Sequence, residues 1–372
     1  MRTMTLGVEE ELHVVDLATG ALVPRGDEVL AAARPALGER VTRELNLCQV
    51  ETATPVCHDL AEVHAAVQEA RTALLDAAAP EGLGVIAAGT HPFGRWEDQE
   101  IDRSRPRYRA LERTYETLAR EQIICGCHVH VGFEDVEDRF PALAQVRSWL
   151  PVLLALSANS PHWQGEDTGY ASFRHQVWRR WPTAGLPPDL NSSAEYERVV
   201  RELVDAQVVA DGTFLYWDVR PSERYPTLEI RAFDTCLRAE DVTALAGAVR
   251  ALLWSSVDGG RSLEPLRPEV LDASLWRASR YGVEAELVSP LSGQVVPARE
   301  VVEALLEHCH EGLEAHGDTE VVTAGLHRIL TRGSGASDQR SLIAAHGGDE
   351  QAVAQDLVAL TAGAATGTRT AA

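Results

Sequence analysis

The strongest constraint on how this chain folds is a period-two alternation of apolar and polar residues in which the polar positions are nearly all titratable. Three segments show it, and their titratable positions are Glu9, Glu11 and His13 in residues 6–16, His128 and His130 in residues 123–133, and Glu229 and Arg231 in residues 227–235. Successive side chains of a strand point to opposite faces. The pattern therefore predicts strands with one apolar face and one titratable face.

A fourth strand is expected at residues 45–52, with Glu51 near its end. If the four strands pair in one sheet, their titratable faces form a common floor, and their apolar faces pack against helices. Glu44 precedes Glu51 by seven residues, so a regular strand would place the two on opposite faces. Glu44 would reach the floor only through a bulge or a turn before the strand.

Such a floor brings like charges together, so the carboxyls must either take up protons or surround a cation. Carboxylate oxygens with an occasional imidazole suit Mg²⁺ or Mn²⁺. The alternative is a solvated face on which the Glu and His side chains are simply exposed. Because four strands share the same character, the sequence favours the metal-binding floor.

Between the strands, apolar residues recur at helical spacing. Helices are expected at residues 59–79, 106–121, 140–159 with a break near Pro151, 193–210, 239–257 and 298–315, with a further strand at 214–220. Helix pairs between non-adjacent strands argue against a doubly wound sheet and predict a single α+β domain over residues 1–332. Residues 331–338 are expected to form a flexible connection, and residues 333–372 a helical and flexible tail that frays at its end.

All 34 basic residues of the chain are arginine. Without lysine there can be no Schiff-base or P-loop lysine, so phosphate would have to be bound by arginine, backbone N–H groups or metal ions. The net charge of −22 disfavours nucleic acid and anionic membranes as partners. Six cysteines and an acidic N-terminal stretch without a signal-peptide pattern predict reduced thiols and a cytoplasmic location.

Six motifs resemble, in the same order, the type 2 glutamate–cysteine ligase family of carboxylate–amine ligases: GVEEE (7–11), RELNLCQVETATP (43–55), GTHP (89–92), GCHVHVG (126–132), SPHWQGEDTGYASFRHQVWRRWPTAG (160–185) and DVRPSERYPTLEIRAFD (218–234). The resemblance runs from about residue 4 to about residue 330. It implies a glutamine-synthetase-like α+β fold, with a curved, mainly antiparallel sheet, helices on its outer face and the active site on its concave face. It also implies amide formation that uses ATP and Mg²⁺ or Mn²⁺ through an acyl phosphate, with small carboxylate or amino-acid and amine substrates.

The resemblance also assigns roles to the titratable residues. It implies metal ligands at Glu9, Glu11, Glu51, His128 and Glu229, with Glu44 as a further acidic position. His130 would lie beside the nucleotide, and Arg231 would contact the transferred phosphoryl group. Arg220 is a second candidate for phosphate, so the expected catalytic residues are Arg231, Glu229 and Arg220.

The segment 160–191 is rich in Trp, Arg, Gly and Pro and is expected to be a long loop. Arg174 is predicted to hold a substrate carboxylate, and Trp163, Thr168 and Tyr170 are predicted to line the substrate pocket. The alternative is a packed surface loop. Long loops without secondary structure of their own are usually functional, and the resemblance favours substrate contact.

Two other functions stay open: a metal-dependent hydrolase that uses the same acidic floor without nucleotide, and a non-catalytic binding protein on this fold. A zinc site made of Cys125, Cys127, His128 and His130 is disfavoured because alternation places the cysteines and histidines on opposite faces. Relatives suggest a homodimer, and the amine acceptor is left open.

Overall fold

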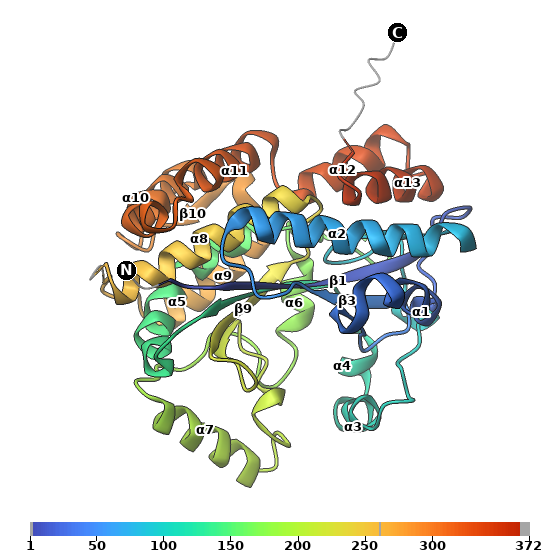
Figure 1. Ribbon diagram of the computed structural model, residues 1–372. Helices are drawn as coiled ribbons and strands as arrows, with labels where there is room; N and C mark the ends of the chain where they lie inside the picture. Colours follow the sequence, from blue (N-terminus) through green and yellow to red (C-terminus); the bar gives the residue numbers. More distant parts are fainter. Residues whose placement is uncertain (1–2, 260–261, 365–372) are drawn as a thin grey trace.

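Figure 1 shows the computed structural model, which describes residues 3–259 and 262–364. One sheet contains seven of the described strands in the order β2-β3-β1-β5-β9-β8, with β4 beside the C-terminal part of β1, and every pairing is antiparallel. These strands are β1 (Leu6–Asp16), β2 (Val41–Arg43), β3 (Gln49–Ala53), β4 (Leu83–Ile86), β5 (Gly126–Gly132), β8 (Val219–Pro221) and β9 (Thr227–Asp234). The expected α+β class with an antiparallel sheet is confirmed.

The apolar face of the sheet packs against three long helices: α2 (Leu60–Ala78), α8 (Ala239–Val257) and α5 (Arg139–Ser157). Val8, Val129 and Ile230 from three neighbouring strands share one buried cluster with Trp149 and Leu245 from the helices. Burial of this apolar surface is the main favourable term in folding. It also fixes the direction of the titratable side chains, which point to the opposite face.

Figure 1 shows which helices stand on each side of the sheet. α2 and α8 cover one side, and the further helices on that side include α10 (Ala298–His316) and α11 (Thr319–Arg332). α3 (Pro106–Tyr115), α4 (Thr117–Arg120) and α7 (Ser193–Asp205) stand on the other side. The remaining helices before residue 300 are α1 (Gly26–Leu37), α6 (Phe173–Trp178) and α9 (Pro268–Tyr281). Helices α3, α4 and α7 therefore stand on the side of the titratable face.

Several expected elements differ in their limits, each for a local reason. α5 continues through Pro151, because the residues on both sides of this proline are buried in the core and hold the helix together despite the missing N–H donor. The segment 106–121 divides into α3 and α4 at Glu116, whose φ of 49° is left-handed. The expected strands at 45–52 and 214–220 begin only at Gln49 and Val219.

The segment 160–191 is less irregular than expected. It contains a short hairpin of β6 (His162–Trp163) and β7 (Glu166–Asp167), followed by α6. A second small hairpin, β10 (Glu286–Val288) and β11 (Val295–Pro297), follows α9.

The C-terminal part folds back onto the sheet as α12 (Gly335–Ala345) and α13 (Glu350–Thr361). Val353, Leu357 and Leu360 of α13 are buried in a cluster with Val15 and Ile86. The expected flexible connection at 331–338 was wrong, because α11 reaches Arg332 and α12 begins at Gly335. The predicted fraying concerns 361–372, of which 365–372 lie outside the described residues. The domain division at residue 332 stays a prediction.

One helical stretch among the described residues, Val136–Ser157, is long and apolar enough to cross a membrane by length and composition. Its most apolar window is 83% buried inside the protein. The stretch includes α5, which lies against β9 and α8.

A buried ion pair joins the sheet to α2. Glu10 lies on the apolar face of β1, where its carboxylate accepts hydrogen bonds of 2.6 and 3.0 Å from the Arg71 guanidinium. Arg71 is fully buried and also donates to the carbonyl oxygens of Cys236 and Leu237 at 2.7 and 3.0 Å. One arginine therefore connects α2, β1 and the chain segment that follows β9.

Replacing Arg71 with Met should lower the free energy of unfolding by about 3–5 kcal/mol, because the change leaves Glu10 as an uncompensated buried charge. Chemical denaturation measures the change. Glu69→Gln on the same helix removes an exposed ion pair with Arg40 and should cost less than about 1 kcal/mol. A loss in R71M no larger than that of the control would contradict the role given to Arg71.

Candidate active site

The strand register brings the predicted titratable residues together. Glu11 pairs with Glu51, Glu9 with His128, and His130 with Glu229 across neighbouring strands. Arg220 of β8 pairs with Glu229 from the other side. These side chains line one cavity of about 380 Å³ on the titratable face of the sheet, together with Glu44 and Arg231. The expected floor is therefore present as a geometric arrangement.

A bulge in β9 corrects the simple alternation. Val129 pairs with Ile230 and Cys127 with Phe233, so β9 has one residue more than β5 between these pairs. Ile230 and Phe233 consequently share the apolar face although they are three residues apart, and Asp234 turns to the titratable face. At the bulge, the backbone N–H of Arg231 donates a hydrogen bond of 2.8 Å to the carbonyl oxygen of Asp218.

Glu44 reaches the cavity through a turn. It follows β2 directly, and the chain reverses before β3 begins at Gln49. On the facing strand, Thr42 donates to Glu51 at 2.8 Å. Of the two possibilities that the sequence left open, a bulge or a turn, the structure has the turn.

Among the described residues, two groups of side chains could hold a metal ion: Glu9, His128 and Glu229, and Glu11, Glu51 and His128. In each group, one ligand atom per residue lies within 4.8 Å of the others. Within the described part of the chain, the buried Nε2 atom of His128 has no hydrogen-bond partner. Oxygen-rich donors with one imidazole fit Mg²⁺ or Mn²⁺, so the residues present fit the expected ion.

The carboxylates of the floor divide by their electrostatic surroundings. Burial raises the pKa of Glu51 well above its usual range, and the charges of Glu9, Glu44 and Glu11 raise it further. Burial and the charge of Glu11 raise the pKa of Glu44 to about 8. These two carboxyls therefore take up protons when nothing else compensates them.

Glu9 and Glu229 differ from Glu44 and Glu51, because they have positively charged or hydrogen-bonding partners. Burial alone would raise the pKa of Glu229, but the Arg231 and Arg220 guanidinium groups outweigh it and hold that pKa well below its usual range. Glu9 is likewise held ionised, since hydrogen bonds with His128 and His130 outweigh its burial and lower its pKa. Glu9 and Glu229 are thus fixed negative charges of the floor, whereas Glu44 and Glu51 are protonatable.

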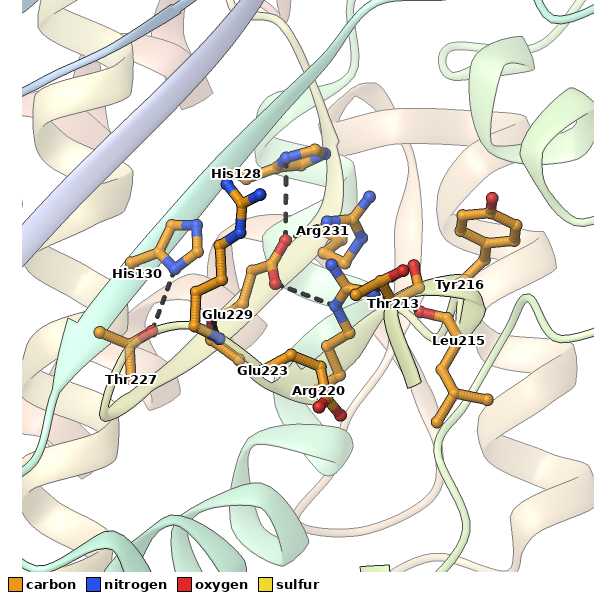
Figure 2. Close-up of polar contacts among 12 residues, drawn as sticks. His128, His130, Thr213, Leu215, Tyr216, Arg220, Glu223, Thr227, Glu229 and Arg231 are labelled. Carbon is orange, nitrogen blue, oxygen red and sulfur yellow. Dashed lines mark hydrogen bonds and ion pairs between the residues drawn. The ribbon is translucent and has the colours of Figure 1, made fainter. Parts of the chain in front are cut away.

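The two predicted arginines are not equivalent. Arg220 Nε donates to Glu229 at 2.9 Å, as Figure 2 shows. Its Nη1 donates to the carbonyl oxygens of Thr213 and Leu215. Arg220 therefore positions Glu229. Arg231 forms an ion pair with Glu229, but its buried Nε has no partner among the described residues. Arg231 is the better candidate for contact with a bound anion.

His130 stands beside this cluster. Its Nδ1 atom lies 3.1 Å from the Thr227 hydroxyl, and its Nε2 atom lies 3.5 Å from Glu9. Nearby charges of Glu9 and Glu229 outweigh burial and raise its pKa. His130 therefore binds a proton more readily than a free imidazole does.

The structure does not bring the four predicted substrate-pocket residues, Trp163, Thr168, Tyr170 and Arg174, to the lining of this cavity. Trp163 packs against Phe173, and the Thr168 hydroxyl donates to Pro161 O at 2.8 Å. Tyr170 accepts from Trp276 Nε1 at 3.2 Å.

Arg174 is fully buried. It packs so closely against Gly126 of β5 that a Cβ atom at this glycine would lie 2.2 Å from the Arg174 Nη2 atom. The short β6–β7 hairpin and the turn into α6 direct the four predicted side chains away from the lining of the cavity.

The aromatic residues that do line the cavity lie a few positions further along the chain or in other segments. They are Tyr108, Trp178, Trp181, Tyr216 and Tyr225. Sequence reasoning missed them because their placement depends on α6 and α3, whose positions on the titratable face no local pattern specifies. The only available signal was the density of tryptophan near residue 180.

Comparison with known proteins decides the family. The sequence model described as glutamate–cysteine ligase family 2 matches residues 5–359. The chain belongs to this family. The match extends past residue 330, where the resemblance in the sequence fades, and includes most of α13.

Relatives and solved structures agree with this membership. A protein named for glutamate–cysteine ligase 2 in Rhodopirellula baltica is 38% identical over 96% of both chains. One named for glutamate–cysteine ligase 2-2 in Mycolicibacterium smegmatis is 41% identical over 90% of this chain and 85% of its own. The glutamate–cysteine ligase of Francisella tularensis, solved in complex with AMP, has the same fold, with a TM-score of 0.73 and 11% identity. The match covers 97% of this chain and 89% of that one.

A bifunctional glutathione synthetase from Pasteurella multocida has a TM-score of 0.67 at 16% identity, and the match covers 97% of this chain and 51% of that one. The fold expected from the resemblance is confirmed, and this member of the family is a ligase.

Glu51→Gln should raise the free energy of unfolding of the metal-free ligase by about 1 kcal/mol or more at pH 8. A carboxyl whose folded pKa is raised binds more protons in the folded state, so its cost is absent below about pH 4 and grows as the pH rises. The gain should therefore be larger at pH 8 than at pH 6, measured by denaturation in EDTA.

The exposed Glu39→Gln serves as the control and should show neither the gain nor the pH dependence. E51Q should also lose most of the stabilisation that Mn²⁺ gives the parent protein. A variant that is less stable than the parent at pH 8 in EDTA would contradict this account of the floor.

Proposed function

We propose that this protein is an ATP- and Mg²⁺-dependent ligase that joins a carboxylate to an amine through an acyl phosphate, with glutamate as the carboxylate named by its relatives. The observation that carries the proposal is the meeting of two cavities at Glu9 and His130. One is the acidic cavity described above, and the other is an apolar groove.

The apolar groove has a volume of about 570 Å³ and runs along the start of β1. Leu6, Val8, Pro55, Val56, Phe133 and Pro226 line it, and it shares Glu9, His130 and Tyr225 with the acidic cavity. A mainly apolar groove with a charged end suits a purine nucleoside whose phosphates reach the charged end. The Francisella tularensis ligase was solved with AMP, which supports a nucleotide here.

The metal would be held by Glu9, His128 and Glu229 or by Glu11, Glu51 and His128. When bound, Mg²⁺ would screen the phosphate oxygens and polarise the transferred phosphoryl group. The protein contributes fixed charges in a site of low solvent exposure, where electrostatic stabilisation is strongest. Glu229 stays ionised because Arg220 and Arg231 flank it.

The reaction has two bond exchanges. A carboxylate oxygen of the substrate forms a bond with the γ-phosphorus while the bond to ADP breaks. The amine nitrogen then bonds to the carbonyl carbon, and phosphate leaves with one N–H proton. Arg231 would neutralise the phosphoryl oxygens in the first exchange, because its side chain lines the cavity and its Nε has no partner among the described residues.

Glu229→Gln and Arg231→Gln should each lower kcat for amine-dependent phosphate release by at least about 100-fold, because each removes a fixed charge at the transferring group. The assay contains ATP, MgCl₂, glutamate and a panel of amines, with products identified by mass spectrometry. Arg113→Gln, an exposed change on α3, is the matched control. An active E229Q variant would contradict the assignment of the floor.

An ATP analogue that cannot be cleaved, added with Mg²⁺, should raise Tm of the parent protein. Arg231→Gln should reduce that shift. If neither a nucleotide-dependent rise in Tm nor amine-dependent phosphate release is detected, the proposal fails. The metal-dependent hydrolase then becomes the better interpretation.

A further inference from the structure

One wall of the acidic cavity is aromatic and uncharged. It consists of Leu45, Tyr108, Leu111, Gln122, Ile124, Trp178, Trp181 and Tyr216. Five of these belong to a hydrophobic cluster of their own, separate from the core beneath the sheet, and Trp178 packs against that cluster. Its members come from the turn after β2, from α3, from the α6 region and from the segment before β8. The chain thus builds a hydrophobic wall on the face that is otherwise titratable.

The wall also contains polar atoms without partners. Gln122 and Trp181 are each 4% exposed and line the cavity. Gln122 Nε2 donates to the carbonyl oxygens of Leu118 and Val177, but its Oε1 atom accepts nothing from the described residues. Trp181 Nε1 likewise has no acceptor in the described part of the protein. Buried polar atoms normally have partners, so these two atoms are available to the polar groups of a bound ligand.

Trp178 joins this wall to the reacting centre. The guanidinium carbon of Arg231 lies 5.5 Å from the centroid of the Trp178 ring. The same ring packs edge-on against Tyr216, at a centroid distance of 5.2 Å. A substrate group that packs on this wall would therefore lie beside the position where Arg231 meets the phosphoryl group.

We infer that the aromatic wall is the subsite for the amine substrate, and that it selects an amine with a flat apolar group and no carboxylate. This inference rests on the proposed ligase function. A carboxylate on the amine would need a cation, and the wall residues are uncharged; Arg107, which lines the cavity beside Tyr108, already donates to Thr213 and lies over the Phe214 ring. Gln122 Oε1 offers an acceptor for an N–H of the amine, whose lone pair forms the C–N bond while phosphate leaves with the proton. Cysteine would leave most of the wall uncovered.

The experiment compares 2-phenylethylamine, methylamine and cysteine as acceptors, with ATP, MgCl₂ and glutamate, by phosphate release and mass spectrometry of the amide. We expect kcat/KM for 2-phenylethylamine to exceed both other values at least tenfold. A value for cysteine equal to or above that for 2-phenylethylamine overturns the inference and leaves the proposed function standing. No amine-dependent release with any of the three overturns both.

A variant separates substrate contact from packing. Leu111→Phe narrows the wall and should lower the ratio of kcat/KM for 2-phenylethylamine to that for methylamine at least tenfold. Leu118→Phe makes the same change on α4 at a residue that does not line the cavity, and it should keep the parent ratio. An unchanged ratio in a folded L111F, as judged by Tm, overturns the inference.

Discussion

The structure depends on holding several carboxylates close together on a partly buried face. Mutual repulsion and burial both oppose this arrangement, and the chain compensates it only in part: the charges of Arg231 and Arg220 hold Glu229 ionised, and hydrogen bonds from the two histidines hold Glu9 ionised. Glu44 and Glu51 are left with raised pKa values. A site that its own side chains compensate incompletely suits a cation, and the binding of a cation there would stabilise the fold.

The opposite face of the same strands supplies the free energy that this arrangement needs. Alternation along β1, β5 and β9 places valine, isoleucine and leucine against α2, α5 and α8. Where a charge falls on this face, at Glu10, a fully buried arginine pairs with it. Since the chain contains no lysine, arginine performs both tasks: it is a structural counter-charge at Arg71 and a candidate phosphate ligand at Arg231.

Much of the floor could be predicted from the sequence because strand alternation is a local property. Glu9, Glu11, His128, His130 and Glu229 followed from period two alone, and antiparallel register brings them together. Features that depend on tertiary packing could not be predicted in this way. The turn at Glu44, the course of the chain through Pro151 and the docking of α13 each reflect contacts between distant segments. The sequence predicted substrate contacts within residues 163–174. In the structure, the chain reaches the cavity only at the end of α6 and beyond it, at Trp178 and Trp181.

The bulge in β9 has a consequence for how this family can vary in length. By adding one residue between Ile230 and Phe233, it turns Asp234 to the titratable face, where the carboxylate accepts bonds from the Asn159 amide and from the Ser160 and Ser172 hydroxyls. Those bonds hold the chain just before α6, and α6 carries Trp178. Loss of a single residue here would reverse the faces of Phe233 and Asp234. The spacing within this strand is therefore as much a part of the active site as its side chains.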